Sequence, residues 1–135
     1  MKTFKNKRGQ INVFRSEKDL SIIVTPQGFI SKRLLQQFLQ ELKVITENQA
    51  GLSMNHIIDT SKVVFANPLN LFYLREIKKL KGIGWYMVIV PNPLLRILVF
   101  LTKWINKPDK VFKSMEDCQI FLTEQGDVKT YRNDF

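Results

Sequence analysis

The spacing of apolar and polar side chains predicts short β-strands that alternate with amphipathic helices. Residues 11–15 (INVFR) alternate apolar and polar side chains, and residues 20–25 are rich in β-branched types. Two such runs joined by a short polar turn are typical of a β-hairpin. Pro26 and Gly28 follow, and we expect them to end the second strand.

Three further strands are predicted later in the chain. Residues 56–59 form a short run that ends in Asp59, and residues 85–90 (WYMVIV) form a continuous apolar run. Unbroken apolar runs are typical of strands that are buried on both faces. We expect a short edge strand at residues 111–112, and we interpret Gly82 and Gly84 as helix-stop and turn residues.

Four segments have apolar side chains at the spacing of one helical face. Each begins after a residue type that caps helix N-termini, and two of the caps are Asn followed by Pro, which fits the first helical turn. The four predicted caps are Ser31, Asn67, Asn92 and Ser114. The third predicted helix, residues 93–105, is apolar on more than one face.

This order of elements predicts an α/β fold, because parallel strands need crossover connections between them. We expect a mixed, mostly parallel sheet of four to five strands with an N-terminal hairpin and four helices. A length of 135 residues suits a single domain. Residues 1–135 are expected to form it, with a core from about residue 11 to 125 and polar tails at both ends.

Charge and hydropathy limit the classes of partner. The net charge is +9, but the basic residues are scattered and no nucleic-acid-binding motif accompanies them, so we do not expect nucleic acid as a partner. Residues 94–105 are interrupted by Arg96 and Lys103 and are too short to span a bilayer, which needs about 20 apolar residues. The N-terminal residues lack an apolar stretch behind their charges, so we expect no secretory signal and a cytoplasmic location.

No arrangement of residues in the sequence points to catalysis. His56 is the single histidine and has no Cys close to it in sequence, which argues against a metal site. The chain has no Gly-x-Ser-x-Gly motif, and Cys118 is predicted to pack as a small apolar side chain. We therefore expect neither an enzyme nor a bound cofactor.

The first candidate binding surface combines a strand end with the loop that opens the second predicted helix. Its residues are Asp59, Asn67, Pro68, Leu69 and Asn70. The loop is interpreted either as a site for a protein partner or a small anion, or as a well-capped helix start. For the carboxylate of Asp59, we expect hydrogen bonds to local backbone N–H groups rather than a contact with a partner.

The second candidate is the apolar surface of the third predicted helix. Its residues are Leu94, Ile97, Leu98, Leu101 and Trp104. If only one side of this helix packs on the sheet, the remainder is exposed and marks an interface, a lipid groove or a contact with a membrane surface. We expect instead that the helix is buried on two sides, by the sheet and by a neighbouring helix or a second subunit.

Two segments of the sequence resemble a known domain. Residues 57–74 (IIDTSKVVFANPLNLFYL) combine a strand ending in Asp with a helix-opening loop, and residues 85–122, from WYMVIV to DKVFKSMEDCQIFL, combine a strand, a helix, a short strand and a closing helix. This order is similar to that of the STAS domain, the family of sulphate transporters and anti-sigma-factor antagonists. The resemblance covers about residues 11–125 and implies a mostly parallel sheet and a protein-binding, commonly regulatory role.

The resemblance also implies a switch that this sequence departs from. In the antagonists, a kinase phosphorylates a serine in the loop before the second helix, and the added charge breaks the complex. Residues 67–70 stand at the matching place and carry no hydroxyl, which puts this switch in doubt. A related branch of the fold resembles lipid-binding domains of the Sec14 type, in which a groove between helices and sheet accepts an apolar ligand.

The predicted function is therefore a non-catalytic protein-interaction module that works in bacterial-type regulation. The alternative is a carrier or sensor of an apolar, lipid-like ligand, held in a groove between the third helix and the sheet. A protein partner is expected, and a homodimer stays open as a further interpretation.

Overall fold

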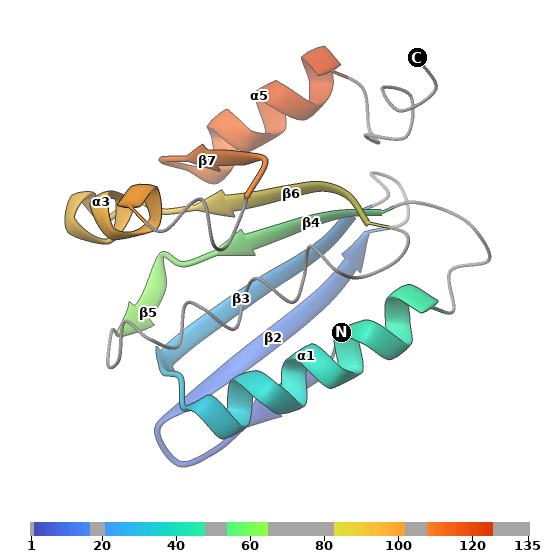
Figure 1. The fold of residues 1–135 in the computed structure, drawn as a ribbon, viewed down its shortest axis with the longest axis vertical. Coiled ribbons are helices and arrows are strands. Elements are labelled where there is room, and N and C mark those ends of the chain that lie inside the picture. The colour runs from blue at the N-terminus through green and yellow to red at the C-terminus, as the bar shows by residue number, and fades with distance from the viewer. Residues whose placement is uncertain (1, 17–20, 48–53, 65–82, 102–107, 126–135) are drawn as a thin grey trace.

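The fold is given by a computed structural model that describes residues 2–16, 21–47, 54–64, 83–101 and 108–125. In these residues, seven strands form one sheet in the order β1-β2-β3-β4-β6-β7, and β5 also pairs with β3 (Figure 1). The strands are β1 (Lys2–Lys5), β2 (Gly9–Ser16), β3 (Ser21–Phe29), β4 (Met54–Asp59), β5 (Lys62–Val64), β6 (Ile83–Ile89) and β7 (Lys110–Phe112).

The pairing directions confirm a mixed, mostly parallel sheet. The pairs β1–β2 and β2–β3 are antiparallel, which confirms the hairpin predicted near the N-terminus. The pairs β3–β4, β3–β5, β4–β6 and β6–β7 are parallel. The parallel pairs β3–β4 and β6–β7 are joined by crossover connections that contain a helix, as the alternation of strand and helix patterns predicted.

The described helices are α1 (Lys32–Glu47), α3 (Pro93–Leu101) and α5 (Met115–Gln125). Their three predicted N-caps are confirmed by hydrogen bonds from backbone N–H groups. The Leu34 N–H donates to Ser31 Oγ (3.1 Å), the Leu94 N–H to Asn92 Oδ1 (2.9 Å) and the Asp117 N–H to Ser114 Oγ (3.2 Å). The helix predicted to follow Asn67 lies outside the described residues.

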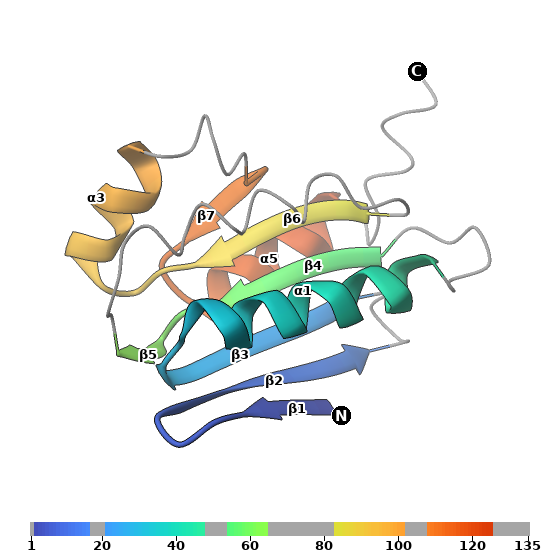
Figure 2. The same cartoon turned by 60° about the horizontal axis from the view of Figure 1, so that its bottom comes forward.

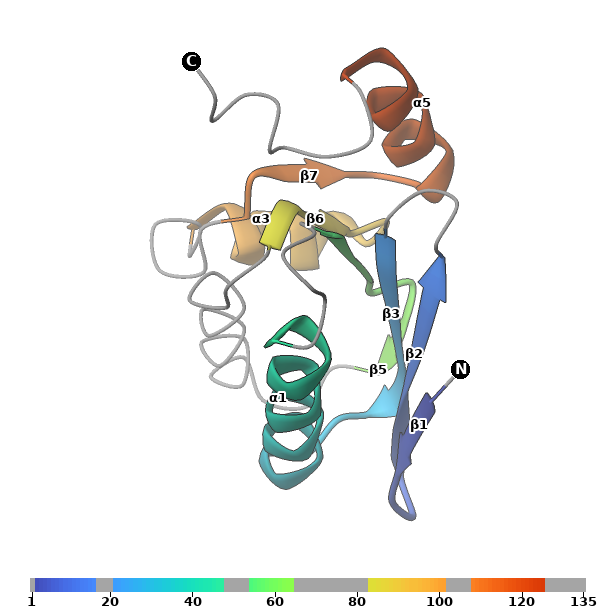
Figure 3. The same cartoon turned by 90° about the vertical axis from the view of Figure 1, so that its right-hand side faces the viewer.

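Two helices cover opposite faces of the sheet (Figure 3). Apolar side chains of α1 pack in one cluster with alternate side chains of β2, β3, β4 and β6. Side chains of α5 pack in a second cluster with the remaining side chains of β4 and β6. The central strand β6 is therefore apolar on both faces, and residues 85–90 are all buried, as predicted.

The predicted N-terminal tail is wrong for the first residues, because Lys2–Lys5 form strand β1 at the edge of the sheet (Figure 2). The segment KTFK has a single apolar side chain, Phe4, so its sequence carries no strand pattern. Phe4 packs edge-on against Phe38 of α1, with ring centroids 6.3 Å apart. Lysines on an outer strand are typical of a protected sheet edge.

The prediction that Pro26 and Gly28 end the second strand is also wrong, because β3 continues to Phe29. On one edge β3 pairs with β4 at residues 21–24 and with β5 at residues 27–29, so Pro26 falls between the two ladders. Proline is tolerated where a ladder is interrupted. Gly28 has a φ of 71°, a conformation that favours glycine.

Gly84 lies inside β6 and is not the turn residue that we predicted. A Cβ at this position would lie 2.8 Å from the Asn55 side-chain oxygen. The β4–β6 register shifts at this point, and Asn55 Oδ1 accepts a hydrogen bond from the Trp85 N–H (3.0 Å). A glycine is needed here because the side chain of the neighbouring strand occupies the space of a Cβ.

Candidate functional site

Helix α3 stands at the carboxyl end of β6, beyond the end of the sheet that α1 and α5 cover (Figure 1). Asn92 caps it, with its side-chain oxygen 2.9 Å from the Leu94 nitrogen and 3.3 Å from the Leu95 nitrogen. Val99 is buried and Leu95 is half-buried, and both pack against the core cluster on the α1 side. One side of α3 therefore anchors the helix to the domain.

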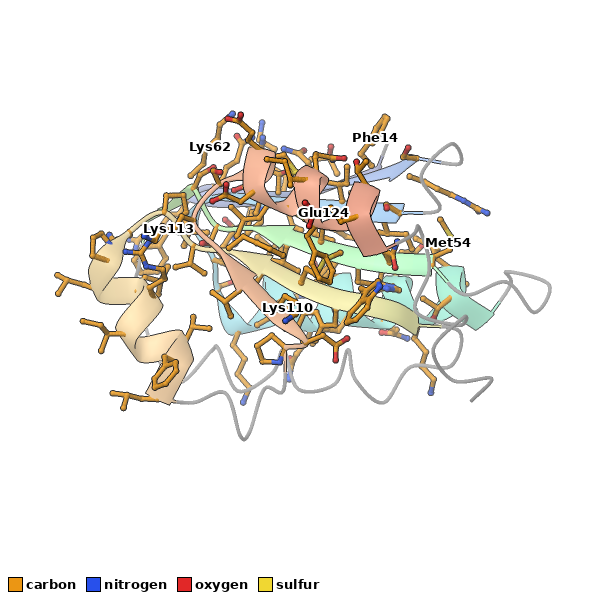
Figure 4. All side chains as sticks on the ribbon, turned by 90° about the horizontal axis from the view of Figure 1, so that it is seen from above. Phe14, Met54, Lys62, Lys110, Lys113 and Glu124 are labelled. Atoms are coloured by element: carbon orange, nitrogen blue, oxygen red, sulfur yellow. The ribbon has the colours of Figure 1, made fainter. Side chains whose placement is uncertain are left out.

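The opposite side of α3 is apolar and exposed. The exposed fractions are 77% for Leu94, 57% for Ile97, 63% for Phe100 and 62% for Leu101. Figure 4 shows that part of the α3 side chains project outward at the end of the domain. Within the single chain, these side chains are not covered by the sheet or by a described helix, so their burial by a second subunit stays a prediction. The Leu98 side chain and Trp104, predicted in the same set, lie outside the described residues.

Asp59 of the other candidate surface forms a local turn at the end of β4. Its Oδ1 accepts a hydrogen bond from the Ser61 N–H (3.0 Å), which is the local bond expected from the sequence. Thr60 is buried, and its hydroxyl donates to the Ile89 carbonyl at 2.7 Å, which ties this turn to β6. Asn67, Pro68, Leu69 and Asn70 lie outside the described residues, so their contact with a partner stays a prediction.

His56 and Tyr86 are neighbours in the β4–β6 register and are both fully buried. His56 Nδ1 lies 3.0 Å from the Met54 carbonyl, so Nδ1 carries the proton and donates. Burial lowers the pKa of His56 to about 4, although this hydrogen bond acts in the opposite direction. Burial and the negative charge of Asp109 raise the pKa of Tyr86. Both side chains are therefore uncharged at neutral pH.

Cys118 is buried in the α5 cluster, as its sequence context predicted. Its sulfur lies 3.9 Å from the sulfur of Met87. Burial raises the pKa of the thiol to about 11, so the reactive thiolate is almost absent at neutral pH.

The described residues contain no group of three or more His, Cys, Asp or Glu side chains that could hold a metal ion. Among the helices of the described ranges, none has the length and apolar character needed to cross a membrane.

Replacing Tyr86 by Phe is expected to stabilise the domain. The Tyr86 hydroxyl is buried and has no hydrogen-bond partner in the described part of the chain. Burying an unpaired hydroxyl costs about 1 kcal/mol or more, and Phe keeps the shape of the ring. We expect the free energy of unfolding to rise by about 1 kcal/mol in urea denaturation. A less stable Phe variant would show that the hydroxyl is hydrogen-bonded in the folded protein.

One of three comparisons with known proteins finds a match. No family model matches the sequence, and no curated protein matches it. Among solved structures, the chain is similar to an anti-sigma factor antagonist from Mycobacterium paratuberculosis. The TM-score is 0.62 at 20% sequence identity, and the match covers 84% of this chain and 94% of that one. The chain has the STAS fold.

This result confirms the resemblance that segments 57–74 and 85–122 indicated, at the level of the fold. The order of STAS elements also explains why α3 stands where it does, since it joins the central strand β6 to the edge strand β7. Phe100 belongs to the exposed face but was not among the predicted site residues. The sequence feature that pointed to Phe100 was the apolar character of the whole helix. This feature does not distinguish an outward side chain from an inward one.

Proposed function

We propose that this STAS domain is a non-catalytic, regulatory protein-interaction module. The observation that carries the proposal is the fold, shared over 84% of the chain with a protein named as an anti-sigma factor antagonist. The proposal assigns to this chain the regulatory role that this name describes. A protein partner, bacterial-type regulation and a cytoplasmic location belong to it and stay predictions.

The state of the titratable core residues supports a role without catalysis. His56 and Cys118 are the side chains most often used as base and nucleophile, and both are buried here. Their pKa values, lowered to about 4 and raised to about 11, keep them uncharged at neutral pH. They lie on opposite faces of the sheet, because His56 is in register with Tyr86 of the α1 cluster and Cys118 belongs to the α5 cluster.

We place the partner surface at the carboxyl end of β4. Asp59 is half-buried there, Ser61 is exposed, and the loop at residues 67–70 follows in sequence. Carboxyl ends of parallel strands are where open α/β sheets commonly bind their ligands. The loop is the part of this surface that the resemblance to the antagonists indicates.

Replacing Leu69 by Asp is expected to remove binding of a protein partner without unfolding the domain. A charge placed at the centre of an interface commonly weakens binding about tenfold or more. The immobilised domain is used to capture proteins from a lysate of the source cells, and each captured protein is quantified by mass spectrometry. Val44→Asp on α1, where Val44 is 47% exposed, is the matched control. Equal capture of every protein by both variants would exclude this loop as the binding surface.

The alternative function, a carrier of an apolar ligand, stays a prediction. It needs apolar side chains that line a groove between α3 and the sheet. Leu94, Ile97 and Leu101 are 57–77% exposed, so these side chains give such a groove no support. A homodimer likewise stays a prediction.

A further inference from the structure

The exposed face of α3 is a continuous apolar stripe. Leu94, Ile97 and Leu101 are spaced by three and four residues, which places them on one side of the helix. Phe100 lies beside them, and all four side chains are more than half exposed. In soluble proteins, a large exposed apolar surface commonly marks a binding surface.

The shape of this surface limits what can cover it. The helix stands at one end of the sheet, and its outer side chains point away from the sheet (Figure 4). A projecting helix of nine residues, about 14 Å long, offers a ridge and not a pocket. A ridge of this kind can enter the boundary between the headgroups and acyl chains of a membrane, because this fluid region adapts to the shape of the helix.

Positive charge lies on and near α3. Arg96 is half-buried on the helix itself, and residues 93–101 contain no acidic side chain. Exposed lysines Lys62 and Lys113 lie toward the α3 end of the domain in Figure 4, opposite Met54. The chain as a whole carries a net charge of +9. Positive charge attracts anionic lipid headgroups and repels a second copy of the same surface.

Three acidic side chains of the described residues follow strands that end toward α3. Asp59 accepts a hydrogen bond from the Ser61 N–H in its own turn. Glu116 and Asp117 begin α5, which covers the opposite face of the sheet from the cluster that anchors α3. They therefore do not interrupt the outward stripe.

We propose that the outward face of α3 docks on an anionic membrane surface. Leu94, Ile97, Phe100 and Leu101 enter the boundary between headgroups and acyl chains, while Arg96, Lys62 and Lys113 contact the phosphates. The helix lies in the plane of the interface and does not cross the bilayer. This inference does not rest on the protein partner proposed above, since it uses different residues.

The first test compares matched double variants in vesicle co-sedimentation. Vesicles contain phosphatidylcholine alone or phosphatidylcholine with 30% phosphatidylglycerol. The wild-type protein is expected to bind the anionic vesicles, and Leu94→Glu with Ile97→Glu to weaken that binding about tenfold or more. The control, Val44→Glu with Ile120→Glu, adds the same charge at side chains that are 47% and 50% exposed on α1 and α5. It is expected to retain most of the binding.

A second test does not depend on the added charges. Ile97→Cys is labelled with a polarity-sensitive fluorophore, and Ile120→Cys is labelled as the control. The native Cys118 is buried and its thiol pKa is raised to about 11, so the folded protein reacts at the introduced cysteine. Anionic vesicles are expected to shift the emission of the label at position 97 to shorter wavelength and to leave the label at position 120 unchanged.

Three outcomes would overturn the proposal. One is the absence of binding to anionic vesicles at low salt. Another is equal loss of binding in both double variants, which would show general attraction of a basic protein. The third is a concentration-dependent dimer that only the α3 variant abolishes, together with no vesicle binding, which would assign the stripe to a second copy or a protein partner. Failure in any of these ways leaves the Leu69→Asp test of the protein partner unaffected.

Discussion

Lowering the pH from 7.5 to 5 is expected to destabilise the folded domain by about 2 kcal/mol through His56. An exposed histidine in the unfolded chain takes up a proton near pH 6.5, whereas burial lowers the pKa of His56 in the folded protein to about 4. Between these values the unfolded state binds more protons than the folded state. Stability is therefore full above pH 6.5 and falls as the pH decreases toward 4.

The structure makes this effect specific to one residue. His56 is the single histidine, and most carboxylates titrate below pH 5, so few other groups change charge in this range. The imidazole cannot accept the proton cheaply, because its Nε2 is buried and has no hydrogen-bond partner among the described residues. Full protonation below pH 4 is expected to remove about 3 kcal/mol.

Urea denaturation between pH 5 and 7.5 measures this effect directly. His56→Gln removes the titrating group, so its stability is expected to be nearly independent of pH over the same range. A pH titration of the His56 ring by NMR supplies an independent reading of the pKa. Parallel pH profiles for the wild type and the Gln variant, or a His56 pKa near 6.5, would contradict the prediction.

The sequence predicted the elements that depend on local hydrogen bonds or on a continuous or periodic pattern of apolar side chains. The apolar run at residues 85–90 predicted a strand buried on both faces, because only a central strand needs apolar side chains at every position. The caps Ser31, Asn92 and Ser114 were predictable because each bonds a backbone N–H two or three residues later. Such bonds form within one turn and depend little on the rest of the fold.

The errors arose where distant residues decide the outcome. Strand β1 is formed by pairing with β2 and by the contact between Phe4 and Phe38, 34 positions later in the chain (38 − 4), and its own sequence carries no strand signal. Gly84 is required by the side chain of Asn55 in the neighbouring strand. Such requirements become visible only when the partner strand is in place.

The exposure of the α3 side chains also depends on distant parts of the fold. Its composition predicts burial, because a helix that is apolar all round is usually enclosed. Its exposure follows from where β6 ends, since the helix begins beyond the part of the sheet that α1 and α5 cover. Sequence periodicity could identify the stripe of Leu94, Ile97 and Leu101 but could not decide what lies against it.

Replacing Phe38 by Ala is expected to lower the free energy of unfolding by about 4 kcal/mol. Phe38 is 1% exposed and lies in the α1 cluster with Ile11 and Val13 of β2. Removing its ring leaves a cavity and also removes the edge-on contact with Phe4 of β1. Since small domains are stable by about 5–15 kcal/mol, a large part of the stability is lost.

Phe14→Ala is the matched control, because it removes the same atoms from the neighbouring strand β2 on a side chain that is 51% exposed. Its expected cost is below about 1 kcal/mol, as for most exposed positions. Guanidinium denaturation compares the two variants, and hydrogen exchange reports the amides of Lys2–Lys5 separately. Faster exchange in β1 of the Phe38 variant is expected, because the contact between the Phe4 and Phe38 rings joins this edge strand to α1. Equal stability of the Phe38 and Phe14 variants would show that α1 does not pack on β2 as described.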